Sequence, residues 1–302
     1  MTSENSRCKF VALLGTPNVG KSTLLNWLVG TKISIVTPKV QTTRTRVIGI
    51  VMRGDVQIVF IDTPGIFLPK QRLHRAMVEA AWSGARQADN IILLVDANTG
   101  LTEDTDRVLV KLKRQNRPVI VALNKIDLVK RPQLLSLASV LGKEEFVTDV
   151  FMISALTGDG VEDLIAKTAE SAPIGPWLYP KEYLSDVPLR VLAAELTREK
   201  LFLQLQDELP YSAIVETEQW DETDDGSVRV DQTIYVQRNS QKLIVVGKNG
   251  SRIKSIGIAS RSELKKLLGR NVHLFLHVKV RRDWGERPEH YRAMGLNFNA
   301  QP

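Results

Sequence analysis

Short apolar runs alternate with stretches of helical periodicity from residue 9 to about residue 170. Polar residues, glycine or proline bound each run, as they usually bound strands. Six runs predict strands: Phe10–Leu14, Val47–Met52, Val56–Ile61, Ile91–Val95, Val119–Leu123 and Val150–Ile153. Strands that alternate with helices are typical of a mostly parallel sheet, so we expect an α/β domain with helices on both faces.

The second and third predicted strands are joined only by Arg53-Gly54-Asp55. Three residues are too few for a crossover helix, so we expect an antiparallel hairpin at the edge of the sheet. The other strands end in polar loops that carry glycine or aspartate. Because ligands bind at the carboxyl ends of strands in open α/β sheets, these loops are the first place to look for a site.

The pattern changes after residue 175. Pro176, Pro180 and Pro188 argue against a helix, so residues 176–188 are predicted to form a linker. Beyond it the spacing predicts a helix, two strands, a further apolar strand, a second helix and a last strand, at residues 189–207, 213–220, 228–237, 242–246, 251–268 and 272–280. We therefore expect one domain at residues 1–175 and a separate α+β domain at residues 189–302.

Composition narrows the class of protein. A length of 302 residues fits two domains, and 43% hydrophobic with 25% charged residues is ordinary for a globular protein. Cys8 is the only cysteine, so no internal disulfide can form, which favours a reducing compartment. No apolar run approaches the ~18–20 residues that cross a bilayer. The polar residues 1–9 do not resemble a signal peptide, so we expect a cytoplasmic protein.

The net charge of +7 is unevenly distributed in the second half. Residues 211–237 carry seven acidic residues and one basic residue, whereas residues 238–282 carry twelve basic residues against Glu263 alone. A basic region of this density favours a polyanionic partner such as nucleic acid. A solvated basic helix and edge strand would have the same composition, so charge alone leaves both interpretations open.

Residues 15–22, Gly-Thr-Pro-Asn-Val-Gly-Lys-Ser, match the phosphate-binding pattern G-x-x-x-x-G-K-[ST] between a predicted strand and a predicted helix. In such a loop, backbone N–H groups surround the phosphates, Lys21 reaches the β- and γ-phosphates, and Ser22 binds Mg²⁺. The residues predicted to bind nucleotide here are Gly15, Asn18, Val19, Gly20, Lys21, Ser22 and Thr23.

Asp62-Thr63-Pro64-Gly65 follows the third predicted strand. Alone, this tetrapeptide predicts only a turn. Downstream of a phosphate loop, Asp62 is expected to hold Mg²⁺ and the Gly65 N–H to meet the γ-phosphate.

Asn124-Lys125-Ile126-Asp127 ends the fifth predicted strand and Ser154-Ala155 ends the sixth. The carboxylate of Asp127 can accept two hydrogen bonds from guanine, from N1–H and the exocyclic amine, and adenine does not offer this pair. Asn124 and the Ala155 N–H can contact the O6 side of the guanine base. We therefore predict a site that prefers guanine, by a factor of ~10⁴–10⁵.

With these motifs in order, residues 9–170 resemble a GTPase domain of the translation-factor class. The resemblance implies a switch threonine in Gln41-Thr42-Thr43-Arg44 that completes Mg²⁺ coordination, and it points to Thr43, although the sequence leaves Thr42 open. It also implies the catalytic groups and the Mg²⁺ ligands, namely Lys21, Thr43 and Gly65 for catalysis and Ser22, Thr43 and Asp62 for the metal.

Ile66 departs from Ras-type GTPases, which carry a water-orienting glutamine at this place. A hydrocarbon side chain cannot orient water. Hydrolysis then relies on Mg²⁺, Lys21 and backbone groups, on a partner, or on an added cation. Asn18 resembles an asparagine that helps to hold K⁺ in some relatives, and shaping the loop is its alternative role.

Gly247-Lys248-Asn249-Gly250 follows the apolar run 242–246 and opens a basic helix. This arrangement resembles the GXXG loop of KH domains, which holds about four single-stranded nucleotides. The resemblance implies RNA binding by Gly247, Lys248, Asn249, Gly250, Arg252 and Lys254. Ile244, Val246 and Ile253 either form an apolar floor for bases or pack in the core.

Together, the GTPase motifs and the KH module resemble the Era family of GTPases over almost the whole chain. The resemblance implies a GTP-hydrolysing switch that binds GTP and GDP, with Mg²⁺ as cofactor, while K⁺ stays the candidate for the added cation at Asn18. It also implies binding to single-stranded RNA at the 3′ end of 16S rRNA, a role in assembly of the 30S subunit, and peripheral association with the cytoplasmic face of the inner membrane. We further expect a monomer.

A second interpretation belongs to a different class of protein. It is a regulatory GTPase whose C-terminal domain docks a protein or an anionic membrane. Competition between single-stranded RNA and anionic vesicles would distinguish the two. An ATP-dependent kinase is disfavoured by Asp127.

Overall fold

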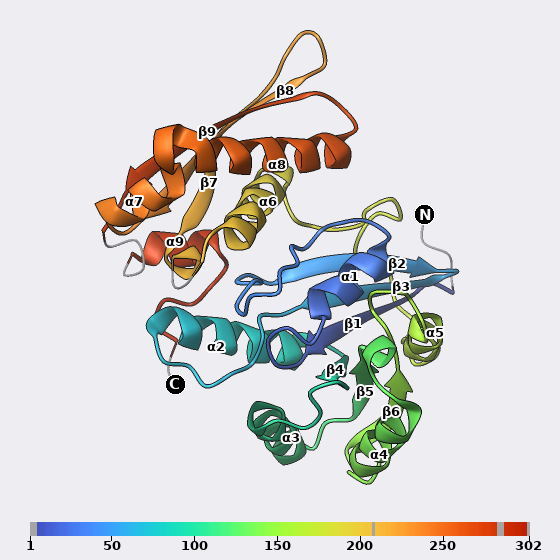
Figure 1. Cartoon of the computed structure of the whole chain (residues 1–302). Helices are drawn as coiled ribbons and strands as arrows, with labels where there is room; N and C mark the ends of the chain where they lie inside the picture. The colour runs from blue at the N-terminus through green and yellow to red at the C-terminus, as the bar shows by residue number, and fades with distance from the viewer. Residues whose placement is uncertain (1–4, 207–208, 283–286, 301–302) are drawn as a thin grey trace. The chain divides into compact units, whose positions relative to one another are not determined.

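The computed structural model describes residues 5–206, 209–282 and 287–300 and divides into two compact units (Figure 1). The first unit comprises residues 1–34, 43–186 and 294–302, and the second comprises residues 35–42 and 187–293. Two segments thus lie in a different unit from the one that chain order predicts. Residues 35–42 pack within the second unit and residues 294–300 within the first, because contacts rather than chain order define a compact unit.

The sheet of the first unit has the strand order β2-β3-β1-β4-β5-β6. Its strands are β1 (Arg7–Leu14), β2 (Val47–Arg53), β3 (Val56–Asp62), β4 (Asn90–Asp96), β5 (Val119–Asn124) and β6 (Val147–Met152). Only β2 pairs antiparallel, with Val47 opposite Asp62, and the other neighbours are parallel. The predicted mostly parallel sheet and its edge hairpin are confirmed, although the last strand begins at Val147 rather than Val150.

Helices cover both faces of this sheet (Figure 1). They are α1 (Lys21–Val29), α2 (Arg72–Gln87), α3 (Glu103–Gln115), the short η1 (Ile126–Leu128), α4 (Arg131–Leu141) and α5 (Val161–Glu170). Trp82 of α2, Val108 of α3 and Leu134 of α4 are buried in one core cluster with β4 and β5. Burial on both faces explains why the central strands are continuously apolar.

Residues 176–186, most of the predicted linker, lie along the β2–β3 hairpin of the first unit. Gln57 Oε1 accepts hydrogen bonds from the backbone N–H groups of Leu178 and Tyr179 at 2.8 and 3.0 Å. The Ile50 N–H donates to the Leu184 carbonyl at 2.9 Å. These bonds extend the ordered edge of the sheet through the proline-rich segment.

The second unit has a three-stranded sheet of order β7-β8-β9 with helices on one face. Its elements are α6 (Leu189–Gln204), η2 (Pro210–Ser212), β7 (Ile214–Glu222), β8 (Val228–Val236), α7 (Asn239–Val246), η3 (Lys248–Gly250), α8 (Ser251–Leu268), β9 (Val272–Val280) and α9 (Pro288–Ala293). β7 and β8 are antiparallel, and β8 and β9 are parallel. Residue 207, the predicted end of the first helix, lies outside the described residues. Within the described ranges, no helix is long and apolar enough to cross a membrane.

The strand predicted at residues 242–246 is wrong, because this run belongs to helix α7. Gln241 caps the helix by accepting hydrogen bonds from the N–H groups of Gln237 and Arg238 at 2.8 and 3.0 Å. Val245 is buried while Leu243 is 73% exposed, a spacing that an alternating strand would not produce. The periodicity of a short apolar run does not distinguish a strand from a helix, and the β-branched residues in this run favour the prediction of a strand.

Candidate functional site

The predicted nucleotide motifs follow the carboxyl ends of strands in the first unit. Residues 15–20 connect β1 to α1, Asp62 is the last residue of β3, and Asn124 is the last residue of β5. Ser154 follows β6. Parallel neighbours end at the same edge of the sheet, so segments far apart in the sequence meet there.

The phosphate loop is shaped by glycines that no other residue could replace without strain. Gly20 has a φ of 98°, and a Cβ at this position would lie 2.2 Å from Nδ2 of Asn124. A Cβ on Gly15, with a φ of 149°, would lie 2.6 Å from the Leu94 carbonyl oxygen. The loop therefore packs its backbone tightly against β4 and β5 before it enters α1.

Lys21 is the first residue of α1 and is buried. Its ammonium donates hydrogen bonds to the carbonyl oxygens of Gly15 and Thr16 at 3.2 and 2.9 Å, which directs it into the loop. Burial lowers the pKa of Lys21 to about 8, against the opposing effect of Asp62. A buried cation with this little compensation is suited to an anionic ligand.

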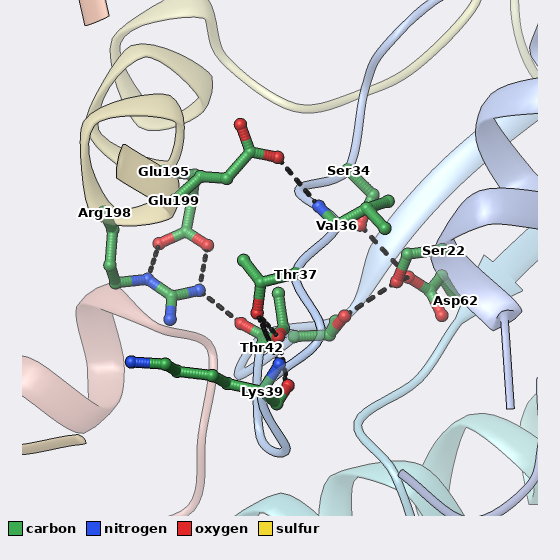
Figure 2. Close-up of polar contacts among 11 residues, drawn as sticks. Ser22, Ser34, Val36, Thr37, Lys39, Thr42, Asp62, Glu195, Arg198 and Glu199 are labelled. Atoms are coloured by element: carbon green, nitrogen blue, oxygen red, sulfur yellow. Dashed lines mark hydrogen bonds and ion pairs between the residues drawn. The ribbon is translucent and has the colours of Figure 1, made fainter. Parts of the chain in front are cut away.

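The side chains of Ser22, Ser34 and Asp62 meet in a cluster of oxygen atoms (Figure 2), which the Thr43 hydroxyl joins at Ser22. The Ser22 hydroxyl donates to Asp62 Oδ2 at 2.6 Å and lies 2.8 Å from the Thr43 hydroxyl. The Ser34 hydroxyl donates to the same Asp62 oxygen at 3.2 Å. Burial raises the pKa of Asp62, while Lys21 and these hydroxyls lower it.

The cluster fits a divalent cation. Oδ1 of Asp62 is buried and has no hydrogen-bond partner among the described residues. A carboxylate and two hydroxyls are hard oxygen donors, which Mg²⁺ prefers together with phosphate and water oxygens. The donors provided by Ser22, Thr43 and Asp62 therefore suit Mg²⁺.

The structure places the two switch threonines differently. The Thr43 hydroxyl lies at Ser22, in the oxygen cluster. The Thr42 hydroxyl instead donates to the Lys39 carbonyl at 2.7 Å and contacts the Thr37 hydroxyl at 2.6 Å. Of the two alternatives that the sequence left open, the geometry favours Thr43 as the metal ligand.

Asn124 ties two loops of the base site together. Its Nδ2 donates to the Val19 carbonyl at 2.7 Å, and its Oδ1 accepts from the Ala155 N–H at 2.8 Å. The side chain thus holds the phosphate loop against the loop after β6, a positioning role that the motif did not reveal. Asp127 is exposed and makes no hydrogen bond or ion pair with the rest of the described chain, so its carboxylate is open to a base.

Lys125 and Ser154 complete the surroundings of the base site. The Lys125 ammonium pairs with Asp96 at 2.5 Å, a partner that sequence reasoning missed because Asp96 lies at the end of β4, outside any motif. Ser154 is buried, and its hydroxyl accepts from the Thr157 N–H at 3.2 Å. Ser154 therefore shapes the loop that carries Ala155.

Gly65 and Ile66 lie against the phosphate loop. A Cβ on Gly65 would lie 2.8 Å from Pro17, so only glycine allows this approach. The Ile66 N–H donates to the Gly15 carbonyl at 3.0 Å, and its side chain is buried in the core under β1 and β3. Ile66 accordingly has no polar group to direct at a water molecule.

Ser34 is a site residue that sequence reasoning missed. Its N–H and that of Ile33 both donate to Asn26 Oδ1 at 2.9 Å, which fixes the backbone after α1 and directs the Ser34 hydroxyl to Asp62. No spacing rule marks a serine in a loop as a neighbour of Asp62, so only the fold could reveal it.

The predicted RNA loop lies between α7 and α8. Gly247, Asn249 and Gly250 all have positive φ, and a Cβ on Gly247 would lie 2.8 Å from Arg252 Cβ. Lys248, Asn249 and Lys254 are exposed. Arg252 donates to the Ile244 carbonyl at 2.8 Å, so it also caps the end of α7.

The sequence left two roles open for the apolar residues around this loop, namely a floor for bases and packing in the core. Ile244 is 46% exposed, whereas Ile253 packs against the core of the second unit. Val246 is half-buried. Of these three residues, only Ile244 is exposed.

Comparison with known proteins shows which families and relatives this chain resembles. Residues 10–125 match the family described as 50S ribosome-binding GTPase, and residues 208–285 match the KH domain. The chain is 54% identical to GTPase Era of Afipia carboxidovorans over 293 residues, which covers 97% of this chain and 95% of that protein. It is 55% identical to GTPase Era of Mesorhizobium japonicum over 289 residues, which covers 96% and 93%.

Two solved structures are similar over both units. One is a crystal structure of Era in complex with MgGDPNP and nucleotides 1506–1542 of 16S ribosomal RNA, with a TM-score of 0.91 and 40% identity, covering 96% of this chain and 99% of that chain. The other is a variant of Aquifex aeolicus Era bound to GDP·AlF4⁻, with a TM-score of 0.90, 40% identity and the same coverage.

Proposed function

Because the chain belongs to the Era family of GTPases, we propose that it couples hydrolysis of GTP to GDP and phosphate to the binding of single-stranded rRNA by its KH domain. The observation that carries the proposal is the oxygen cluster of Ser22, Thr43 and Asp62 beside Lys21. Two motifs distant in sequence and a switch threonine meet there at the end of a glycine loop.

Each residue of the phosphate site has a role in this proposal. The loop backbone from Gly15 to Gly20 surrounds the phosphates, and Lys21 neutralises the charge that develops between the β- and γ-phosphates. Ser22, Thr43 and Asp62 would hold Mg²⁺, which when bound neutralises phosphate charge. Gly65 presents its N–H to the γ-phosphate.

The base is proposed to be guanine, recognised by Asp127. Asp127→Asn should weaken GTP binding by ~10³-fold or more and improve binding of xanthosine triphosphate, because the new amide donates where the carboxylate accepted. Fluorescence titration of both nucleotides measures this. Unchanged GTP affinity with no gain for the xanthine nucleotide would rule out Asp127 as the base-reading residue.

We further propose that the KH loop binds the 3′ end of 16S rRNA and that the protein acts in assembly of the 30S subunit. The structure of a related Era in complex with nucleotides 1506–1542 of 16S ribosomal RNA supports an rRNA partner. The exposed Lys248 and Asn249, held by glycines at positive φ, support this. A cytoplasmic protein with peripheral attachment to the inner membrane fits the resemblance.

The RNA proposal is tested with a charge reversal in the loop. Lys248→Asp with Asn249→Asp should weaken binding of a 3′-terminal 16S rRNA oligonucleotide by ~10²-fold or more, because two carboxylates face phosphates. The matched control is Lys266→Asp with Asn271→Asp, which makes the same charge change at two exposed residues, one in the last turn of α8 and one just before β9. Equal loss in both variants would indicate only a general charge effect, and binding to anionic vesicles in place of RNA would favour the docking alternative.

K⁺ is proposed as a second cation beside the phosphates. The buried, apolar Ile66 leaves water activation without a side chain, and Asn18 is exposed in the loop with a φ of 62°. Exchange of K⁺ for Na⁺ at equal ionic strength should slow hydrolysis, and Asn18→Ala should abolish the difference. Equal rates in the two salts would contradict the K⁺ proposal.

A further inference from the structure

Within the first unit, Ser34 connects helix α1 to the end of β3. Ser34 is 3% exposed, and its hydroxyl donates a hydrogen bond to Oδ2 of Asp62 at 3.2 Å (Figure 2). Its N–H donates to Oδ1 of Asn26 at 2.9 Å, and its carbonyl oxygen accepts from Nδ2 of the same side chain at 2.8 Å. Every polar group of Ser34 is therefore used, the backbone on α1 and the side chain on Asp62.

The backbone that carries Ser34 is held from two sides. Asn26 of α1 also accepts a hydrogen bond from the Ile33 N–H at 2.9 Å. The Ile33 side chain is 5% exposed and packs at Gly49 of β2, where a Cβ would lie 3.1 Å from Ile33 Cδ1. These contacts join α1, β2 and the loop between them, and none of them uses a group that we assign to phosphate or metal.

The Asp62 carboxylate depends on its hydrogen bonds for its orientation. The terminal torsion of an aspartate is soft, so hydrogen bonds rather than a preferred rotamer set which oxygen faces a ligand. The hydroxyls of Ser22 and Ser34 both donate to Oδ2. Oδ1 is buried and has no hydrogen-bond partner in the part of the chain that the structure describes. This arrangement leaves Oδ1 for a cation or for a water bound to it.

The two hydroxyl donors differ in their other tasks. The Ser22 oxygen is assigned to Mg²⁺, and it also lies 2.8 Å from the Thr43 hydroxyl. Ser34 has no assigned place on the metal or the phosphates, so its hydroxyl can remain on Oδ2 when the site is loaded. Groups that orient a metal ligand in this way typically change metal affinity by ~10–100-fold when they are removed.

We propose that Ser34 is a positioning residue for the metal site, which holds the Asp62 carboxylate with Oδ1 directed towards bound Mg²⁺. The proposal rests on the proposed GTPase function. Thr43 is expected to complete the metal site only with the γ-phosphate present, whereas Ser34 is fixed by α1 and β2. Loss of the Ser34 hydroxyl should therefore weaken Mg²⁺ binding equally in the GDP complex and in the GTP complex.

The test compares full-length Ser34→Ala with the wild type. The release of fluorescent GDP and of a fluorescent, non-hydrolysable GTP analogue is followed in EDTA and over a series of Mg²⁺ concentrations. We expect the Mg²⁺ concentration that gives half of the slowing of release to rise by about tenfold for both nucleotides. Release in EDTA should stay within about twofold of the wild type, because the contacts of the phosphate loop remain.

Ser6→Ala is the matched control. Ser6 is 5% exposed in the same unit, and its hydroxyl donates to the Gly175 carbonyl oxygen at 3.0 Å rather than to a site residue. It should leave the response to Mg²⁺ unchanged for both nucleotides. Thr43→Ala is the comparison for a switch residue, and it should change the response for the GTP analogue alone.

Asn26→Ala provides a second route if Ser34→Ala does not fold. Asn26 is half-buried, so water can replace its bonds to the backbone, yet the Ser34 hydroxyl loses its fixed direction. It should shift the response to Mg²⁺ in the same direction for both nucleotides.

Two results would overturn the proposal. One is a wild-type response to Mg²⁺ in every folded variant, and the other is faster release by the same factor in EDTA and in Mg²⁺, which indicates a purely structural role. A wild type that does not bind guanine nucleotides would instead overturn the proposed function.

Discussion

At the residue scale, Lys21 and Asp62 are buried ionisable groups, and the rest of the protein only partly compensates the cost of burying their charges. Burial lowers the pKa of Lys21 and raises that of Asp62, and each is only partly compensated by the other. The lysine is suited to an anion and the free Asp62 oxygen to a cation. A phosphate with its metal supplies both, so each of the two buried groups gains an oppositely charged partner when the site is loaded.

This imbalance predicts a proton-linked binding step. In the free protein, Lys21 should titrate near pH 8, and phosphates should raise its pKa by stabilising the ammonium form. Binding then takes up a proton above pH 8, so nucleotide affinity should fall as the pH rises through that value, by at most about tenfold per pH unit. Below about pH 7 affinity should not depend on Lys21, which is then protonated in both states.

NMR of the lysine side-chain ammonium groups, without and with GDP, measures the titration directly. Calorimetry in buffers of different ionisation enthalpy should show proton uptake at pH 8.5, where the terminal phosphate of GDP is already fully ionised. A Lys21 that remains charged to pH 10 in the free protein would contradict the expectation.

At the element scale, α7 shows how one apolar run supports two structures. As a strand, Leu243 and Val245 would share a face. As a helix, they point in different directions, and only Val245 is buried. The helix is favoured because the Gln241 cap satisfies backbone N–H groups at its start and Gly247 ends it with a positive φ.

Two alanine substitutions distinguish these structures. Val245→Ala should destabilise the second unit by about 1.5–2.5 kcal/mol, because it removes buried methyl groups. Leu243→Ala, the control, should change stability by less than about 0.5 kcal/mol, since that side chain is exposed. Hydrogen exchange of the α8 amides reports both, and similar losses would indicate that residues 243 and 245 share a buried face.

At the scale of the whole molecule, each unit contains a segment from the other end of the chain. Ile33 is buried in the first unit, next to Gly49 of β2, and Ile35 is buried in the second with α6. The chain passes from one core to the other within these few residues. Stability of the second unit therefore depends on a segment that lies inside the GTPase sequence.

The pair Ile33→Ala and Ile35→Ala tests this assignment. Ile35→Ala should lower protection from hydrogen exchange in α6 and β8 by about 2–4 kcal/mol and leave β4 and β5 unaffected. Ile33→Ala should have the opposite distribution, with losses around β2. Losses in the first unit from both variants would show that residue 35 does not belong to the second core.

The sequence by itself determined the mostly parallel sheet, its edge hairpin and the nucleotide motifs. Each of these depends on local chemistry: apolar periodicity, glycines that allow close backbone approach, and a lysine and hydroxyl next to them. Only the tertiary structure placed the Thr43 hydroxyl at Ser22 and the Thr42 hydroxyl at Thr37, turned residues 242–246 into a helix, and brought Ser34 to Asp62. These outcomes depend on which polar groups of separate segments are satisfied together, and no local pattern encodes a contact such as that of Ser34 with Asp62, 28 positions apart.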